Sequence, residues 1–162
     1  MTIKQLVTKI KTLPNCIVYP SKGIPAIEEA YTLPDDIREF YDLCGGVSLF
    51  TSAENVANIV PPDEFILANP VIVGERCEED ITADWYIVAN DGNGDYLTVD
   101  LNKDRVGRCY DSFWDRHGVV GECAIIAISF TDLLERLVDN KGQRWYWLRD
   151  GFNSLGDAYD EV

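Results

Sequence analysis

The stretch "IVANDGNGDYLTVDLN" at residues 87–102 joins two strand-like segments through a run of glycine, asparagine and aspartate. In its second half every other residue is apolar, a period that predicts a strand with one face buried and the other in solvent. The apolar positions are Leu97, Val99 and Leu101, and the solvent face is predicted to carry Tyr96, Thr98 and Asp100. Gly92 and Gly94 permit the positive φ of a tight reversal, so the stretch predicts a β-hairpin.

An alternative interpretation of the same run is a calcium loop, because Asp91, Asn93 and Asp95 place side-chain oxygens on alternate positions. An EF-hand loop needs glycine at its sixth position and a bidentate glutamate at its twelfth. Counted from Asp91, those positions hold Tyr96 and Asn102. The hairpin accounts for more of the residues, since aspartate and asparagine side chains bond nearby backbone amides in turns. We therefore expect no metal here and no cofactor elsewhere.

The segments on either side extend the hairpin. "DWYIVAN" at residues 84–90 is rich in aromatic and branched side chains that favour strands. A second turn at residues 102–105 leads into "VGRCYDSFW" at residues 106–114. Together these segments predict a three-stranded antiparallel meander.

Periodicity, glycine and proline place the remaining elements. Apolar residues at helical spacing predict helices at residues 3–13, 34–44 and 130–141, and "PAIEEAY" predicts another over residues 25–31. Short strands are predicted at residues 16–20, at 47–50 and at either 65–68 or 70–74. The most apolar strand, within residues 121–129, is expected to be central. A short final helix is predicted from Phe152, Leu155, Ala158 and Tyr159.

A chain of 162 residues and 18.3 kDa with 46% hydrophobic residues has the size of one domain. We expect an α+β fold, a single domain over residues 1–162 with a mainly antiparallel sheet and helices packed against it. Residues 1–24 would hold the first helix and a short strand, and residues 143–162 an aromatic C-terminal extension. Trp145, Tyr146 and Trp147 are expected to anchor this extension in the core, the alternative being an exposed anchor for a partner.

Cysteine usage and hydropathy indicate a cytoplasmic protein. Five cysteines are scattered along the chain without a CxxC pair, as expected for free thiols in a reducing compartment. No apolar run approaches the roughly 18 residues that a membrane helix needs. The start "MTIKQLVTKIKTLPNC" lacks the apolar core and cleavage site of a signal peptide. We expect no association with membranes.

The net charge of −14 is the strongest global feature of the sequence. It disfavours binding to nucleic acid or an anionic membrane and favours a basic protein partner, although an acidic surface also serves solubility. Acidic residues concentrate in a predicted loop before the strand that begins at Trp85. As candidate partner-binding residues we take Glu75, Glu78, Glu79, Asp80 and Asp84, the alternative being a solvated edge.

Few catalytic arrangements fit this sequence. It contains one histidine, His117, which we expect in a turn near Asp115, and it has no HExxH motif, GxSxG elbow or Walker loop. A pair of carboxylates acting as in glycosidases stays open, because aspartate and glutamate are abundant. We expect a protein without catalytic residues.

Four segments, in this order, resemble the SUKH superfamily, the domain shared by fungal cell-wall-synthesis regulators and many bacterial toxin-immunity proteins. They are "LPDDIREFYDLCGG", "DWYIVANDGNGDYLTVDL", "GRCYDSFWDRHG" and "IIAISFTDLLERL", within residues 25–138. The matching positions are Leu33, Pro34, Phe40, Gly45, Gly46, Trp85, Asp91, Gly92, Gly94, Asp95, Gly107, Ala127, Ser129, Phe130 and Leu134. Cys44 departs from the pattern, since the family often has asparagine before the two glycines.

The resemblance implies an α+β fold, no established catalytic centre and, in bacteria, binding that neutralises a toxin, often a nuclease. The leading hypothesis is therefore an immunity protein whose acidic surface meets a basic toxin domain. A regulatory scaffold, as the fungal relatives imply, is the alternative, and a carboxylate-based hydrolase is the third. The sequence makes no prediction of oligomeric state.

Overall fold

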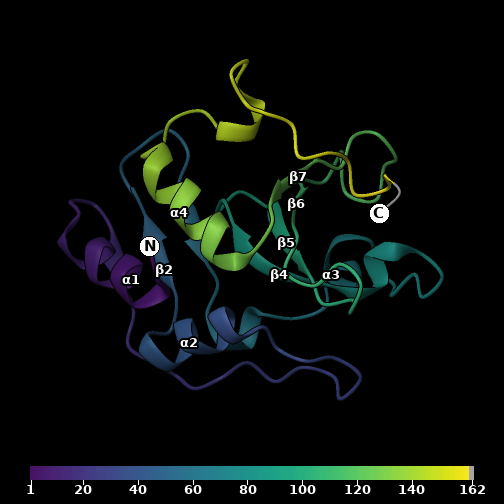
Figure 1. The fold of residues 1–162 in the computed structure, drawn as a ribbon, viewed down its shortest axis with the longest axis horizontal. Coiled ribbons are helices and arrows are strands. Elements are labelled where there is room, and N and C mark those ends of the chain that lie inside the picture. Colours follow the sequence, from purple (N-terminus) through teal and green to yellow (C-terminus); the bar gives the residue numbers. More distant parts are fainter. Residues whose placement is uncertain (161–162) are drawn as a thin grey trace.

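In residues 1–160, the part of the chain that the computed structural model describes, seven strands form one antiparallel sheet in which each strand pairs with the next along the chain (Figure 1). The strands are β1 (Ile17–Val18), β2 (Val47–Leu49), β3 (Ala57–Ile59), β4 (Trp85–Asn90), β5 (Tyr96–Asp100), β6 (Cys109–Ser112) and β7 (Ile125–Ala127). The helices are α1 (Ile3–Thr12), α2 (Asp35–Leu43), α3 (Ala68–Ile72) and α4 (Phe130–Asn140), with 3₁₀ turns at Pro62–Glu64, Ile81–Asp84 and Tyr146–Leu148. The predicted α+β class is confirmed.

The hairpin and the meander are confirmed. β4, β5 and β6 are antiparallel neighbours, with an irregular register between Ile87 and Ala89. In the hairpin loop, Asp91 Oδ1 accepts hydrogen bonds from the backbone N–H groups of Asn93 (2.8 Å) and Asp95 (3.1 Å). Gly92 and Gly94 have φ of 78° and 96°, which a residue with a Cβ rarely adopts. The acidic run therefore builds a turn.

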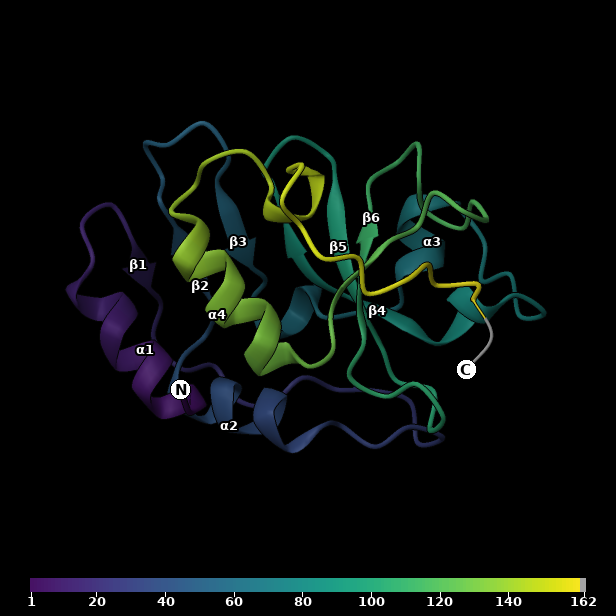
Figure 2. The same ribbon diagram turned by 45° about the horizontal axis from the view of Figure 1, so that its top comes forward.

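The three long helices begin and end as their sequences predict. A capping box at Thr2 starts α1, whose buried face carries Ile3, Leu6, Val7 and Ile10. The Ser129 side chain caps α4, which ends at the left-handed Lys141 just before Gly142. In Figure 2, α4 lies in front of the sheet, with α1 and α2 beside it.

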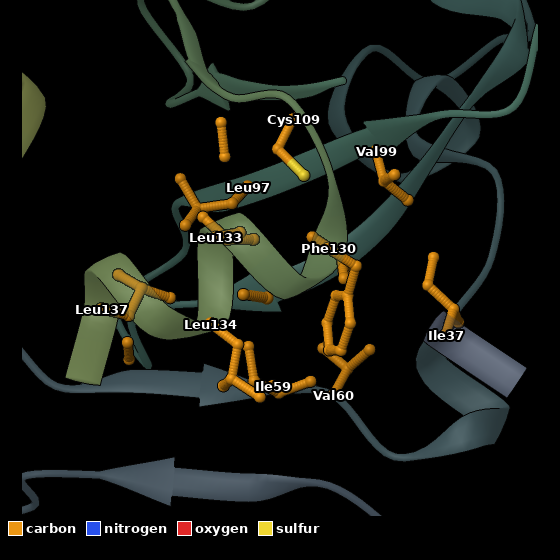
Figure 3. Packing of buried hydrophobic residues seen from close by; sticks show 14 of the residues in the cluster. Ile37, Ile59, Val60, Leu97, Val99, Cys109, Phe130, Leu133, Leu134 and Leu137 are labelled. Carbon is orange, nitrogen blue, oxygen red and sulfur yellow. The ribbon is translucent and has the colours of Figure 1, made fainter. Parts of the chain in front are cut away.

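The main core lies between α4 and the sheet (Figure 3). The helix contributes Phe130, Leu133, Leu134 and Leu137, and the sheet contributes Ile59, Leu97, Val99 and Cys109. Ile37 of α2 and Val60 close this core beside Phe130. All ten side chains are at most 3% exposed, so each contributes roughly the 1.5–3 kcal/mol typical of a fully buried apolar group of its size.

The predicted solvent face of the hairpin is wrong, because Thr98 and Asp100 are both 0% exposed. The indole of Trp85 stacks on the ring of Tyr110 with centroids 3.9 Å apart, and its Nε1 donates to Asp100. Thr98 Oγ1 and Ser112 Oγ are 2.7 Å apart. Buried polar groups need such partners, and here the sheet carries a hydrogen-bonded polar layer on its second face.

Two predicted local structures are wrong in the middle of the chain. Residues 25–31 form no helix, because Glu28 N donates to the Tyr86 hydroxyl and the Glu28 carboxylate pairs with Arg76, which holds a short segment in a single turn. Residues 70–74 form no strand: most of them belong to α3, while Leu67 makes only an isolated bridge to Tyr86. The sequence prediction also missed β3, which has only three residues.

The C-terminal extension explains two further corrections. β7 is the last strand of the sheet, not a central one, and its outer edge is covered where Ile125 N donates to Gly156 O (2.9 Å). The backbone of residues 152–160 is therefore used for edge contacts and turns, and no helix forms there. The anchoring prediction is confirmed: the stacked rings of Trp145 and Trp147 are 8% and 6% exposed.

Candidate protein-binding face

The five acidic residues predicted to bind a partner lie together between α3 and β4, as the loop prediction required. The structure divides them into two groups. Glu75, Glu78 and Glu79 are exposed, and Val71 and Val73 beside them are exposed apolar residues. This group, Glu75, Glu78 and Glu79, is called the acidic loop below. Its three carboxylates are available to a partner.

Asp80 belongs to the second group. It caps the 3₁₀ turn Ile81–Asp84, accepting hydrogen bonds from Thr82 N (3.1 Å) and Thr82 Oγ1 (2.6 Å). The hydroxyl of Tyr159 donates to it as well, at 2.9 Å. Burial acts to raise the pKa of Asp80, but these donors outweigh it and hold the pKa below its ordinary value. Asp80 therefore fixes the end of the loop to the C-terminal extension.

Asp84 is also committed to internal contacts. It accepts hydrogen bonds from the Tyr31 hydroxyl and from Asn102 Nδ2 (3.0 Å), and Arg105 Nη2 lies 3.9 Å away. The same Arg105 donates through Nε to the buried Asp100 at 2.9 Å. Asp84 thus joins the chain before α2 to the β5–β6 turn, and its availability to a partner is low.

Close backbone contacts leave no room for a side chain at two glycines of the SUKH-like pattern. A Cβ on Gly45 would lie 2.2 Å from Pro20 O, and one on Gly46 would lie 2.6 Å from Ile59 O. Gly46 also has a φ of 115°. Cys44 beside them is fully buried, so this corner carries no polar side chain of the kind the family pattern often has.

A groove of about 650 Å³ brings other pattern residues together. Its lining includes Leu33 and Pro34 before α2, together with Gly107 and Ser129. Ile128, exposed at this groove, adds an apolar surface. Four pattern positions from three separate segments therefore meet at a single surface depression.

The β6–β7 loop carries a residue that the sequence analysis missed. Trp114 is 78% exposed, and its backbone N–H donates to Asp95 Oδ1 of the hairpin at 3.0 Å. No sequence signal marked it, because Trp114 ends the segment predicted as the third strand of the meander, whereas β6 ends at Ser112. Asp95, predicted to support the turn, thus also holds the neighbouring loop.

His117 lies in a turn of this loop, as predicted, and its hydrogen-bond partner is Asn69 of α3. Its Nε2 is 2.6 Å from Asn69 Oδ1, and its ring meets the indole of Trp85 edge-on. Burial lowers the pKa of His117 to about 4. The imidazole is a neutral packing group at neutral pH.

The carboxyl groups with raised pKa values do not form a hydrolytic pair. Burial raises the pKa of Asp100 and of Asp111. Asp100 is held by Trp85, Arg105 and Tyr110, whereas Asp111 is held separately by Arg116 and Trp147. Both are at most 1% exposed, so both serve the interior.

Within residues 1–160, no cluster of three or more histidine, cysteine, aspartate or glutamate residues could hold a metal ion. All five cysteines are free thiols. In the same described part of the chain, no helix has the length and apolar character needed to cross a membrane.

Comparison with known proteins gives two matches. The chain is 57% identical over 162 residues to the immunity protein YokJ of Bacillus subtilis (strain 168), covering 100% of this chain and 98% of that protein. No solved structure matches this chain. The model of the SMI1 / KNR4 family (SUKH-1) matches residues 24–136, which hold the hairpin, the glycine pair and most of α4. The chain belongs to the SMI1 / KNR4 family (SUKH-1).

Proposed function

We propose that this protein is an immunity protein, which binds a toxin and neutralises it. The observation that carries the proposal is the 57% identity, over the whole chain, to a protein named as an immunity protein. Identity of this extent over the full length indicates that the two chains share one fold.

Neutralisation would proceed by binding alone, without catalysis. His117 is buried and neutral, and Asp100 and Asp111 are used in separate internal networks. A general base has to reach its substrate within hydrogen-bonding distance. Side chains enclosed in this way stabilise the fold, and binding of the toxin would fall to the exposed surface.

The toxin would be a basic protein domain, such as a nuclease that holds phosphate. The net charge of −14 opposes binding to nucleic acid and attracts a basic surface. Glu75, Glu78 and Glu79 are the exposed members of the predicted partner-binding set, and Asp80 and Asp84 would support the loop from within. Charges at the rim of an interface mainly speed the encounter of the two proteins. Free thiols suit action in the cytoplasm.

A pull-down from the cell in which the protein occurs, at low and at high salt, tests this function. We expect a basic toxin domain to be retained at low salt and released at high salt, because screening weakens long-range attraction. The retained protein must then lose its activity when the purified immunity protein is added. Retention of a neutral cellular protein instead would indicate the regulatory scaffold.

A further inference from the structure

Within residues 1–160, Trp114 is the most exposed of the large hydrophobic side chains. Its side chain is 78% exposed, whereas Trp85, Trp145 and Trp147 are at most 8% exposed. Val120 in the same loop is 72% exposed. Tryptophan is among the residues most enriched at the energetic centres of protein interfaces.

The backbone that carries Trp114 is fixed from several sides. Its own N–H donates to Asp95 Oδ1, and Arg116 N and His117 N both donate to Phe113 O (2.8 and 2.9 Å). The Arg116 guanidinium lies over the Phe113 ring and pairs with the buried Asp111 at 2.9 Å. His117 ties the loop to α3 through Asn69. A side chain presented on a rigid backbone loses little conformational entropy on binding.

The surroundings of Trp114 are negatively charged. Asp95 is bonded to its backbone, Asp91 lies in the hairpin loop that holds Asp95, and Asp115 follows it with a side chain that is 67% exposed. Arg116 pairs with the buried Asp111 at 2.9 Å and lies 4.0 Å from Asp115. An exposed indole on a loop bonded to this acidic hairpin suits a cation, which gains both cation–π and ionic attraction.

This surface lies next to the acidic loop. The hydroxyl of Tyr159 bridges the two, donating to Asp80 and lying 3.2 Å from Gly118 O of the Trp114 loop. Figures 1 and 2 show α3 and the chain after β6 at the same end of the molecule, away from α1. A single partner can therefore contact both.

We propose that Trp114 is the anchor of the toxin-binding surface, inserting its indole against a lysine or arginine side chain on a basic protein. This inference rests on the proposed function. In this proposal the acidic loop raises the rate at which the toxin associates, and Trp114 lowers the rate at which it dissociates. Loss of the anchor then raises the dissociation rate, because truncating a central interface residue acts mainly on that rate.

The test measures binding of an inactivated form of the toxin to which the Bacillus subtilis relative confers immunity. Three variants of the full chain are compared: Trp114→Ala, Trp114→Phe and, as the control, Ile17→Ala. Ile17 is an exposed apolar residue (45%) on β1, which lies at the other end of the molecule from α3 (Figure 2). We expect Trp114→Ala to bind at least about 30-fold more weakly through faster dissociation, Trp114→Phe to be intermediate and Ile17→Ala to be unchanged.

Fluorescence gives an independent readout, since the other three tryptophans are buried. Acrylamide should quench an exposed component that is absent from Trp114→Ala, and binding of the inactivated toxin should protect it. Equal affinity of Trp114→Ala and wild type overturns the anchor while leaving the proposed function intact. Failure of the wild type itself to bind overturns both. A dimer lost only in Trp114→Ala, with toxin affinity unchanged, assigns the surface to a second copy and overturns the proposal.

Discussion

Tyr159 donates a hydrogen bond to Asp80 across 79 residues of sequence, with 2.9 Å between the hydroxyl and carboxylate oxygens. The contact joins the C-terminal extension to the end of the acidic loop. Asp80, one of the five candidate partner-binding residues, is therefore used to hold the acidic loop in place. Mutations at Asp80 or Tyr159 should change stability, whereas mutations in the acidic loop should change binding.

Replacing Tyr159 with phenylalanine should lower the free energy of unfolding by about 1 kcal/mol, the usual cost of one lost hydrogen bond. Urea denaturation measures this change. Glu79→Gln is the control, because Glu79 is exposed and should change stability little. Equal stability of the Tyr159→Phe variant and wild type would show that the contact does not fix the loop.

The buried histidine predicts a loss of stability in mild acid. His117 has a pKa lowered from 6.5 to about 4, so the folded protein takes up this proton less readily than the unfolded chain. Its contribution is present above 6.5 and falls as the pH falls toward 4, by about 2 kcal/mol between about pH 7.5 and about pH 5. Urea melts of wild type and His117→Gln at both pH values isolate the effect. Parallel pH dependences in the two proteins would contradict it.

Two glycines with similar backbones should respond differently to alanine. Gly46 and Gly94 both have positive φ, but a Cβ meets Ile59 O at 2.6 Å at the first and nothing within 4 Å at the second. Gly94→Ala should cost about 1 kcal/mol from the backbone alone, and Gly46→Ala should cost clearly more. Thermal unfolding compares them. Similar melting temperatures would mean that the chain around Gly46 relaxes freely.

The acidic loop should control the rate at which the protein associates with the toxin. The triple substitution Glu75→Gln, Glu78→Gln and Glu79→Gln should lower this rate about tenfold at low salt and much less at high salt. Stopped-flow mixing measures the rates. The matched control is Glu39→Gln, Asp42→Asn and Asp63→Asn, which removes the same charge from exposed positions on α2 and in the 3₁₀ turn Pro62–Glu64. Equal slowing by both triple variants would assign the effect to net charge alone.

The sequence predicted those elements whose signals are local. The hairpin followed from turn residues between two alternating segments, and α1 and α4 followed from apolar spacing with clear caps. Residues 25–31 carried a helix signal as well, but seven residues are too few to hold a helix against contacts from Tyr86 and Arg76.

The remaining features depend on chain segments far apart in the sequence. Alternation put Thr98 and Asp100 in solvent, and only the folded chain shows that Tyr110, Ser112 and Arg105 satisfy and cover them. For the same reason, counting acids could not distinguish the internally bonded Asp80 from the exposed Glu79. The sequence could not predict the exposure of Trp114 either, because most tryptophans near strands are buried.

The immunity function itself is tested most directly by growth. Cells producing the active toxin to which the Bacillus subtilis relative confers immunity should stop growing, and co-expression of this chain should restore growth as the relative does. Trp114→Ala should restore it less well. Continued growth arrest, with this chain present in folded form and the relative protective in parallel, would contradict the account.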